Sequence, residues 1–451
     1  MKKANQSYLE GVMEKLRFII IGAGNRGGVY SMNAQASKKF QMVGIAEPDD
    51  YLRNYMREKY NVPEDRCFRS YEELLALGKI ADFAMITTQD QLHFAPAMMA
   101  IEKGYNLLLE KPAAPTPEEC LAIANAAEAK GVQVLVCHVL RYTPFCRKVK
   151  EIVDSGKLGK IQSVIHSEGV GNIHYSHSFV RGKWRNSETA SDMLLAKSCH
   201  DLDLLQWLLG SECKKVQSFG RLTYFVHENC PEGAPKRCVE GCPHSGECPY
   251  DATKIYRDFP FEEGAWLRPV ATARENPTAE DVDKVLWESG YGRCVFQCDN
   301  NVVDHQTVNL EYENGETVAF TMSAFNEGGR RIHIMGTKGE LISTDFNTIE
   351  LFIYCDEDKD SPRYGHNTRE VIRTTDCEID QNLSGGHGGG DIGIIDDLWM
   401  LLGEGKTTKS ISTIGTSVRN HLTVFAAEES RKNGGILVDV DEFIKRIPAS
   451  K

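Results

Sequence analysis

The 451 residues of the chain predict two or three domains, since domains average about 150 residues, and its 41% apolar and 26% charged residues exclude collagen, coiled coil and global disorder. The formal net charge of −12, from 52 basic and 64 acidic residues, leaves no basic surplus for nucleic acid or an anionic membrane, so we expect neither as a partner. No apolar run approaches the roughly 18 residues that span a bilayer, and no apolar segment follows the basic start of the chain, so we expect a cytoplasmic protein.

Short apolar runs alternate with helical segments in the first 140 residues, after an N-terminal extension over residues 1–15. The run at residues 16–21 ends at a glycine and is typical of a strand buried on both faces. This alternation predicts βαβ units and an α/β domain with a doubly wound parallel sheet over residues 16–140. The other expected strands are 41–46, 81–86, 105–109 and 132–137, and the expected helices are 28–37, 49–60, 71–77, 94–103 and 117–130.

The pattern changes near residue 140. A helix is expected over residues 144–154, and the segments after it are rich in β-formers and separated by Gly or Asn turns. We therefore expect a second, α+β domain over residues 141–451, built on one large, mostly antiparallel sheet. Residues 226–300 have little periodicity and are expected to be an insertion. The open face of the sheet predicts a homo-oligomer, a dimer or a tetramer. The expected strands of this domain are 161–167, 215–224, 302–312, 317–324, 331–335 and 349–354.

A glycine-rich turn follows the first strand, where residues 22–27 read Gly-Ala-Gly-Asn-Arg-Gly and match the G-x-G-x-x-G pattern. Its glycines permit a tight turn and a close approach of pyrophosphate to the start of the next helix, which predicts a Rossmann domain. Glu47 ends the second strand, where a carboxylate binds ribose hydroxyls and repels a 2′-phosphate, so NAD is expected rather than NADP. The alternative is a glycine turn without a ligand. The expected cofactor residues of the turn are Gly22, Gly24, Asn25, Arg26 and Gly27.

Four further motifs carry a resemblance to a known family. They read Thr-Thr-Gln-Asp-Gln-Leu-His at 87–93, Glu-Lys-Pro at 110–112, His-Val-Leu-Arg-Tyr at 138–142 and Cys-His-Asp-Leu-Asp at 199–203. With the glycine turn, they resemble the glucose–fructose oxidoreductase, inositol dehydrogenase and rhizopine-catabolism (Gfo/Idh/MocA) family. The resemblance implies NAD(P)-dependent oxidation of sugars, cyclic polyols and their derivatives. It also implies cofactor contacts from Thr87, Thr88, His93, Glu110, Lys111 and Arg141, and a substrate contact from Tyr142.

Catalytic roles follow for two residues of these motifs. The resemblance implies that Lys111 reaches both nicotinamide and substrate, where its ammonium stabilises the alkoxide that develops as hydride leaves. His200 is expected to take the hydroxyl proton, because an imidazole is a base at neutral pH. The family has an aspartate four residues before this histidine, but Ala196 stands here, and Lys197 is expected to supply the missing polar group. The alternatives are a surface lysine and a histidine that packs against its own helix.

Three other side chains are candidates for the substrate pocket. Trp184 offers an apolar face to a sugar ring, and Arg185 offers donors to hydroxyls or a carboxylate, although either residue is equally suited to a structural stack. His387 lies among five glycines at residues 385–390, which permits a close approach to a ligand. Asp391 is expected to cap a helix over residues 392–402, and a flexible loop with a cap is the alternative reading of this segment.

Cysteine is the compositional anomaly, with 14 residues in a chain that has no export signal, so thiols or metal ligands are expected in place of disulfides. Cys238, Cys242 and Cys248 lie close together in the insertion and predict a structural zinc site, with Cys230 or Cys294 as the fourth ligand. Cys298 and His244 compete for that position. An iron–sulfur cluster is the rival metal centre, and unligated thiols are the remaining alternative.

Three functions are consistent with these features. The first is an NAD-dependent oxidoreductase that acts on a secondary hydroxyl, or the matching ketone, of a sugar, sugar derivative or cyclic polyol. The second is a glycoside-cleaving enzyme with retained NAD, which works by transient ring oxidation and elimination. The third and weakest is a non-enzymatic NAD-binding regulator, since Lys111 and His200 are both present.

Overall fold

The first domain is a six-stranded parallel sheet with helices on both faces. A computed structural model describes residues 15–258, 266–374 and 387–448, so the predicted extension lies, except for Lys15, outside the described residues. The sheet has the order β3-β2-β1-β4-β5-β6, with every neighbouring pair parallel, as in a doubly wound dinucleotide-binding fold. Its strands are β1(Leu16–Ile21), β2(Phe40–Ala46), β3(Cys67–Phe68), β4(Phe83–Ile86), β5(Asn106–Leu109) and β6(Val134–Val136).

Three of the five helices between these strands begin with a side-chain cap. The side chains of Asp49 and Thr116 accept backbone N–H groups at the start of their helices. The first helix begins after Gly24 without any side-chain cap, so its first N–H groups stay available. The helices are α1(Asn25–Ala36), α2(Asp50–Tyr60), α3(Tyr71–Ala76), α4(Phe94–Glu102) and α5(Pro117–Lys130).

The second domain is built on a nine-stranded sheet in the order β14-β13-β12-β11-β7-β10-β9-β8-β15. Only β7 and β10 are parallel neighbours, and all other pairs are antiparallel, as predicted. One face is buried and the other exposed, most regularly in β9. The strands are β7(Ile161–Gly169), β8(Cys213–Arg221), β9(His305–Tyr312), β10(Thr317–Ser323), β11(Gly329–Gly336), β12(Gly339–Ser343), β13(Thr348–Ile353), β14(Thr368–Arg373) and β15(Val438–Asp439).

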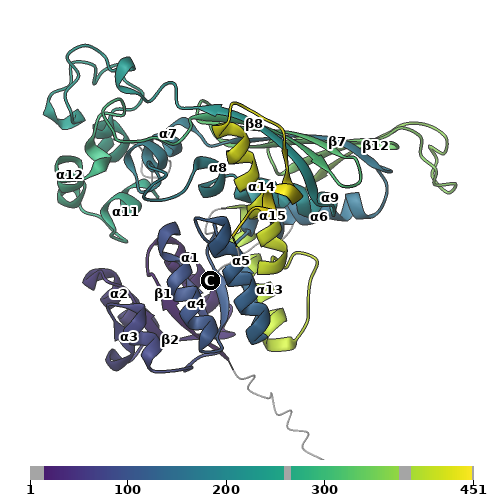
Figure 1. The fold of residues 1–451 in the computed structure, drawn as a ribbon. Helices are drawn as coiled ribbons and strands as arrows, with labels where there is room; N and C mark the ends of the chain where they lie inside the picture. Colours follow the sequence, from purple (N-terminus) through teal and green to yellow (C-terminus); the bar gives the residue numbers. More distant parts are fainter. Residues whose placement is uncertain (1–14, 259–265, 375–386, 449–451) are drawn as a thin grey trace, which may run out of the picture.

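Helices on the inner face of this sheet connect it to the first domain (Figure 1). Near the C-terminus the chain returns to the parallel sheet of the first domain. Ile394 and Leu398 pack into the core on one face of this sheet. Val418 and Leu422 pack into the core on the other face. Figure 1 accordingly shows α13 and α14 beside the purple and blue helices of the first domain. The helices are α6(Pro144–Asp154), α7(Asn172–Tyr175), α8(Met193–Ala196), α9(Cys199–Leu209), α13(Gly390–Glu404), α14(Ile414–Lys432) and α15(Val440–Lys445).

The segment that was expected to be an insertion connects β8 to β9 and contains α11(Leu267–Thr272), α12(Ala279–Glu288) and a π-helical turn, η7(Lys254–Asp258). These elements have a small core of their own, which includes Tyr256 and Leu286. A capping box between Thr278 and Asp281 begins α12. The insertion is therefore more regular than its sequence indicates.

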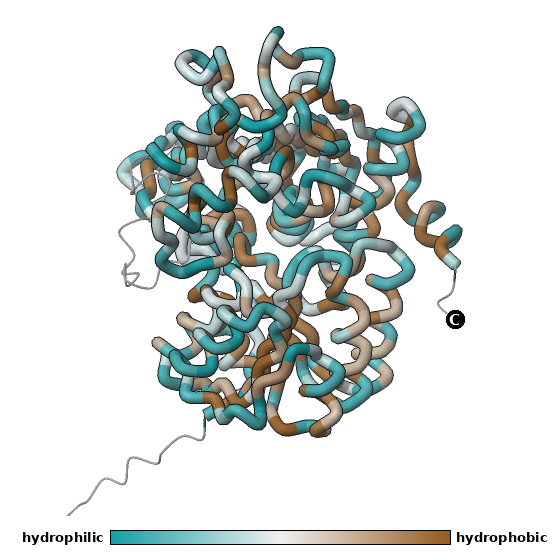
Figure 2. Tube along the Cα trace, turned by 90° about the vertical axis from the view of Figure 1, so that its left-hand side faces the viewer, coloured by the Kyte–Doolittle hydropathy of each residue, from teal (hydrophilic) through white to brown (hydrophobic). Residues whose placement is uncertain are grey.

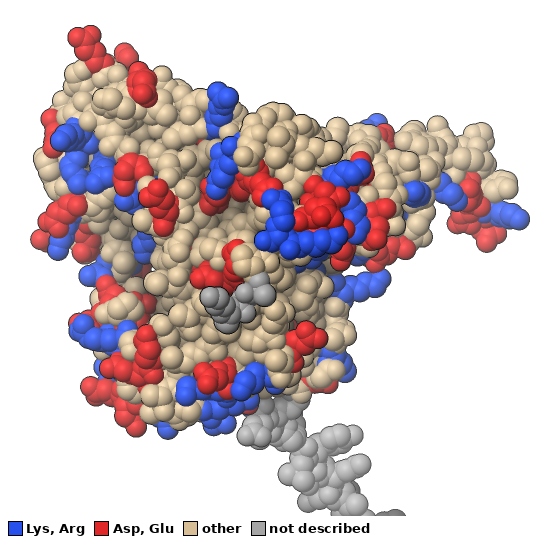
Figure 3. All heavy atoms as spheres, in the orientation of Figure 1, with Lys and Arg blue, Asp and Glu red and all other residues tan. Residues whose placement is uncertain are grey.

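Apolar segments run through the interior of both domains, between more polar surface turns (Figure 2). Acidic and basic side chains are interspersed on the face that Figure 3 shows, without a large patch of one sign. Across the described ranges, no helix combines the length and apolar character needed to cross a membrane.

Candidate active site

The carboxyl ends of the parallel strands gather the side chains that the motifs single out. Gly22 follows β1, Glu47 follows β2, Thr87 follows β4, Glu110 follows β5, and His138 lies two residues after β6. The sheet order reverses between β1 and β4, and ligands of doubly wound sheets bind at the carboxyl ends beside such a reversal. The fold therefore brings the glycine turn and the catalytic candidates to one edge.

The three glycines of the turn have different surroundings. Gly22 has a φ of +92°, and a Cβ there would lie 2.9 Å from the backbone of Thr87. A Cβ at Gly27 would lie 2.4 Å from the carbonyl oxygen of Gly22. At Gly24, in contrast, a Cβ would meet no atom within 4 Å. Gly22 and Gly27 are thus needed for packing, while Gly24 faces open space beside the uncapped start of α1, which fits a pyrophosphate.

Glu47 and Thr87 hold this turn in place. The buried carboxylate of Glu47 accepts the N–H of Ala23 at 2.7 Å and the N–H of Asp49 at 2.9 Å. The hydroxyl of Thr87 donates to the carbonyl of Gly22 at 2.6 Å. Glu47 therefore lies at the end of β2 with its carboxylate against the glycine turn, where an acidic side chain meets the ribose in dinucleotide-binding folds.

Arg26 links the first domain to the C-terminal helix α13. Its guanidinium contacts Glu110 at 2.9 Å and Asp391 at 2.5 Å, and the Tyr30 hydroxyl also donates to Glu110 at 2.8 Å. Burial opposes ionisation of Glu110 and Asp391, but the charge of Arg26 and the other charges and hydrogen bonds at these carboxyls together outweigh it and lower the pKa of both. The predicted capping role of Asp391 is wrong, because α13 already begins at Gly390, and its carboxylate binds Arg26 instead.

Lys111 extends from the end of β5 towards the second domain. Its Nζ donates to the carbonyl oxygen of Ala196 at 2.6 Å, and its backbone N–H donates to Glu110 at 2.8 Å. The peptide bond between Lys111 and Pro112 is cis. Ala196 stands at the position of the family's aspartate, and it is the backbone carbonyl of Ala196 that accepts the hydrogen bond from Lys111.

His200 lies in the first turn of α9 and is only 4% exposed. Its ring centre is 5.8 Å from that of His138 and 5.9 Å from that of His387, and among the described residues its Nδ1 has no hydrogen-bond partner. Burial, and after it the charge of Lys111, hold the pKa of His200 well below its usual value. The imidazole is therefore neutral at pH 7 and free to accept a proton.

Lys197 belongs to a buried network of charges. Its Nζ lies 3.4 Å from Glu168, which also contacts Arg330 at 2.5 Å. Arg330 in turn contacts Asp201 at 2.7 Å, and Asp201 contacts His166 at 2.8 Å. Burial lowers the pKa of Lys197, against the attraction of Glu168. Lys197 is thus a buried amine close to His200 in the chain, with a carboxylate that positions it.

Three further histidines had no role assigned from the sequence, although His138 lies in one of the motifs that carry the family resemblance. His138 lies between His200 and His421, with its ring centre 5.4 Å from that of His421. His421 accepts the N–H of Ala113 at 3.1 Å. Burial holds the pKa of His174 well below its usual value, and the charges of Lys197 and Lys111 lower it further. Their proximity had no local signal, since these histidines are far apart in the sequence and single histidines carry no spacing signal.

Several residues predicted to bind ligands have protein partners. Arg141 forms a buried two-point contact with Asp203, at 2.6 Å for each hydrogen bond. His387 has a φ of +53°, and its Nδ1 lies 3.3 Å from Asp391; Gly385 and Gly386, which belong to the same prediction, lie outside the described residues. The binding roles of all these residues stay predictions. The remaining partners are Ser412 for Tyr142, Asp90 for Trp184, Asp299 for Arg185, Leu92 for Thr88, and Pro112 and Thr88 for His93.

The predicted zinc site is not supported. Within residues 15–258, 266–374 and 387–448, no three or more His, Cys, Asp or Glu side chains form a group that could hold a metal ion. Cys238, Cys242, Cys248 and Cys294 instead line the walls of one cavity together with other residues of the insertion. The thiols therefore do not converge on one point, as the tetrahedral coordination of zinc requires.

Comparisons with known proteins agree with this architecture. Models of an oxidoreductase family match residues 16–138 as its NAD-binding Rossmann fold and residues 150–377 as its C-terminal alpha/beta domain. The Bacillus subtilis protein YteT is 24% identical over 376 residues, which cover 81% of this chain and 83% of YteT. A 2,7-anhydro-N-acetylneuraminate hydratase of Escherichia coli is 25% identical over 148 residues, which cover 33% of this chain and 39% of that enzyme.

A solved structure has the same fold over nearly the whole length. The crystal structure of an inositol dehydrogenase homolog from Azotobacter vinelandii, complexed with NADH and myo-inositol, matches with a TM-score of 0.64 at 17% identity. The match covers 94% of this chain and 98% of that one. The family models span both domains and coincide with the glycine turn and the strand-end motifs. The chain therefore belongs to the Gfo/Idh/MocA family, as an oxidoreductase with an NAD-binding Rossmann fold.

Proposed function

We propose that the protein is an NAD-dependent dehydrogenase that acts on a secondary hydroxyl of a sugar, a sugar derivative or a cyclic polyol. The observation that supports this proposal is that Lys111 follows β5 at the same sheet edge as the glycine turn and that its charge acts on the neutral His200, whose ring lies against that of His138 after β6. An ammonium and a neutral base are the two groups that oxidation of an alcohol requires. The family supports the reaction class, and the homolog that was crystallised with myo-inositol supports the substrate class.

The chain's own residues divide the work between binding and proton transfer. The open side of Gly24 and the uncapped start of α1 would hold the pyrophosphate, and Glu47 the ribose hydroxyls. Bound NAD supplies the group that accepts the hydride. Lys111 donates a hydrogen bond from Nζ to the substrate oxygen and stabilises its developing negative charge. An imidazole nitrogen of His200 accepts the hydroxyl proton, and Glu168 positions Lys197 beside this site.

The direct test is a spectrophotometric screen for NADH formation. Purified protein is mixed with NAD and a panel of pyranoses, sugar acids, amino sugars and inositols. We expect steady NADH formation with at least one of them, and loss of this activity in Lys111 variants. A panel that gives no NADH and no reverse reaction with the matching ketones contradicts the dehydrogenase proposal.

The pH profile is expected to show a base that stays neutral in mild acid. Because burial and Lys111 lower the pKa of His200, its proton-accepting form persists below the usual imidazole pKa of about 6.5. We therefore expect the acid limb of kcat/KM to lie below pH 6.5, and the His200→Asn variant to lose this limb together with most of the activity. The measurement is initial rate against pH in constant-ionic-strength buffers. A limb at or above pH 6.5 contradicts the assignment.

Glu47 is expected to determine the choice between NAD and NADP. The Glu47→Ala variant loses charge-assisted hydrogen bonds to the ribose, each worth about 1.5–3 kcal/mol, so KM for NAD should rise by about 10- to 100-fold. The KM for NADP should fall, because the carboxylate no longer repels the 2′-phosphate. Steady-state kinetics with both cofactors measure this switch. Asp50→Ala, on the exposed start of α2, is the matched control and should change neither value.

A second candidate is elimination or hydration of a sugar without net redox change. The observation in its favour is that the buried amine of Lys197 and the neutral His200 flank the position where the family's aspartate is replaced by Ala196. The relative named as a hydratase is consistent with it. The test is incubation in D₂O with NAD and glycoside or anhydro-sugar substrates. Deuterium at a ring carbon without accumulated NADH supports this candidate, and net NADH supports the dehydrogenase.

Three other predictions stay open to experiment. A non-enzymatic regulator is the weakest reading and requires a protein without turnover on either substrate panel. The homo-oligomer is supported by apolar side chains on the open face of the large sheet, among them Ile165 and Phe219, which are 54% and 51% exposed. Light scattering after gel filtration would distinguish a monomer, dimer and tetramer. The cytoplasmic location also stays a prediction.

A further inference from the structure

The two proposed catalytic side chains come from different domains. Lys111 follows β5 of the parallel sheet, and His200 lies in α9 of the second domain. Their separation depends on the elements that pack against both. The C-terminal helix α14 is such an element, because Val418 and Leu422 belong to a core of the parallel sheet while Val424 belongs to the core of the second domain.

His421 of α14 holds the segment that carries Lys111. Its Nδ1 lies 2.7 Å from the carbonyl of Ser417 and carries the ring hydrogen, since a carbonyl oxygen only accepts. The lone pair of Nε2 then accepts the N–H of Ala113 at 3.1 Å. Ala113 lies two residues after Lys111, and both Ala113 and His421 are fully buried. The neutral imidazole is therefore the acceptor that satisfies a buried backbone N–H.

The other edge of the same peptide unit is also bound by an imidazole. The Nδ1 of His93 donates to the carbonyl of Pro112 at 2.6 Å, again because a carbonyl oxygen only accepts. The ring of Pro112 fixes its φ, so little rotation remains between this peptide unit and Lys111. On the other side, the N–H of Lys111 donates to Glu110 at 2.8 Å. The backbone of Lys111 is thus held from both directions.

Asn420, the residue before His421, holds the segment that carries His200. Its Nδ2 donates to the carbonyl of Cys199 at 3.1 Å, and Cys199 directly precedes His200. Asn420 is 1% exposed. Consecutive residues of an α-helix point about 100° apart, because 3.6 residues make one turn. Neighbouring side chains of α14 can therefore bind two different segments, one in each domain.

A third histidine ring lies between these segments. The ring centre of His138 is 5.4 Å from that of His421 and 5.8 Å from that of His200. His138 is fully buried. The ring of His421 therefore supports the ring that packs against His200, in addition to accepting its hydrogen bond.

We propose that Asn420 and His421 are positioning residues, which fix the ammonium of Lys111 relative to the imidazole of His200. This positioning role rests on the proposed function, because there both groups act on one hydroxyl oxygen. Each positioning residue acts through the backbone of the segment that it binds and does not need to touch the substrate. A misplacement of about 1 Å can lower the rate of a reaction about 100-fold, so the separation of the two groups matters for kcat.

The test removes one hydrogen bond at a time from the full chain. The His421→Phe variant keeps a ring beside His138 but leaves the N–H of Ala113 without its acceptor. The Asn420→Leu variant keeps a similar volume but removes the donor to Cys199. On the substrate that the NADH screen identifies, we expect kcat to fall about 10- to 100-fold in each variant. The KM of the substrate and the dissociation constant of NAD should change little.

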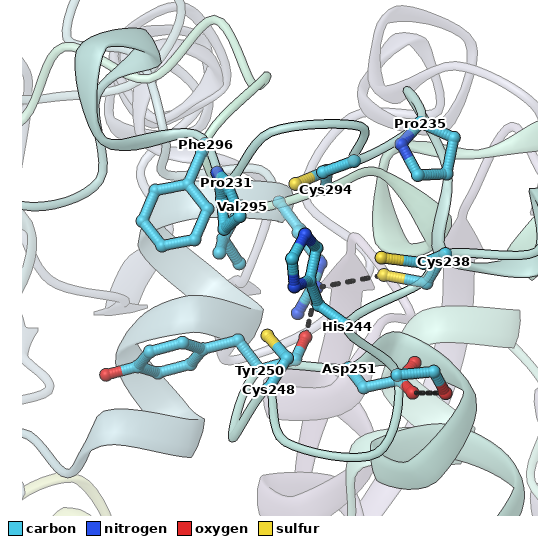
Figure 4. Close-up of a pocket in the computed structure, with 14 residues that line it drawn as sticks. Pro231, Pro235, Cys238, His244, Cys248, Tyr250, Asp251, Cys294, Val295 and Phe296 are labelled. Carbon is cyan, nitrogen blue, oxygen red and sulfur yellow. Dashed lines mark hydrogen bonds between the residues drawn. The ribbon is translucent and has the colours of Figure 1, made fainter.

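Two controls and one rescue separate positioning from packing. Thr423→Val removes a buried hydroxyl whose hydrogen bond ends at Arg419 of the same helix, and it should leave kcat unchanged. His244→Phe makes the same substitution in the cysteine-lined cavity of the insertion (Figure 4), and it should also leave kcat unchanged. His421→Gln keeps an acceptor for Ala113 without the ring, so it should recover part of the lost rate. A role in packing alone predicts less activity for His421→Gln than for His421→Phe.

Crystal structures of the wild type and of His421→Phe test the inference without turnover. We expect the hydrogen bond between the Nζ of Lys111 and the carbonyl of Ala196 to be lengthened or lost in the variant. An unchanged Lys111 side chain, or an unchanged kcat in an active enzyme, overturns the positioning role. A wild-type chain that is inactive on every substrate contradicts the proposed function instead. If circular dichroism shows that His421→Phe does not fold, His421→Gln and Asn420→Leu provide the same comparison.

Discussion

The Lys111→Ala variant should lose about 100- to 1000-fold in kcat on the substrate that the screen identifies. A preorganised donor to a developing oxyanion contributes about this much to the rate, and the Nζ of Lys111 is preorganised by its hydrogen bond to Ala196. NAD affinity should change little, because the glycine turn and Glu47 do not depend on this side chain. Stopped-flow measurement of NADH formation and equilibrium titration of NAD separate the two effects.

Two controls accompany this variant. Lys103→Ala removes an exposed lysine that follows α4 on the same domain and should leave kcat unchanged. Lys111→Arg keeps the charge but alters the donor geometry, so it should recover only part of the rate. If Lys111→Ala keeps wild-type kcat while the enzyme still turns over, Lys111 does not contact the reacting oxygen.

The Asp203→Ala variant should lose about 3–5 kcal/mol of the free energy of unfolding, the largest stability effect that we expect from a single substitution. Asp203 and Arg141 form a fully buried two-point ion pair that joins α9 to the 3-10 turn η3(Val139–Tyr142). Removing the carboxylate leaves the Arg141 guanidinium buried without a counter-charge, which is more costly than losing the pair itself. Chemical denaturation followed by circular dichroism measures the change.

An exposed ion pair provides the control for this loss. Arg446 contacts Glu429 at 2.6 Å on the surface of the C-terminal helices, where solvent screens the charges. The Arg446→Ala variant should change the stability by less than about 1 kcal/mol. Equal losses of unfolding free energy in the two variants would mean that burial does not increase the contribution of the Arg141–Asp203 pair to stability.

The sequence predicted the parallel sheet well because each of its central strands is a short apolar run between clear turns. Residues 16–21 become β1 with the predicted bounds, and the family resemblance is confirmed. Four described strands were missed; β3, β14 and β15 lie at sheet edges, and β12 is a five-residue strand between β11 and β13. β3 has only two residues, and β14, Thr-Arg-Glu-Val-Ile-Arg, lies at the edge of its sheet with mostly exposed side chains. Edge strands need no apolar face, so periodicity does not find them.

In the candidate site too, local motifs were predictable from the sequence and long-range contacts were not. The glycine turn, Lys111 and His200 were predicted because each lies in a local motif with a defined spacing. The contact of Arg26 with Asp391 and the ring pair of His138 with His421 were not found, because the partners are 365 and 283 residues apart (391 − 26 and 421 − 138). Contacts at such separation depend on the return of α13 and α14 to the first domain, which local sequence does not encode.

The 451 residues and their local patterns thus determined the two-domain architecture, the dinucleotide turn and the family, because these depend on hydrophobic periodicity and short motifs. Tertiary structure alone decided which partners the predicted side chains have within the protein, as Arg141 has in Asp203. It also decided that the clustered cysteines surround a cavity beside a buried Arg181 and do not converge on one point. The physical reason is that burial and long-range contacts set the charge, the partners and the orientation of each group, and these arise only when distant segments pack.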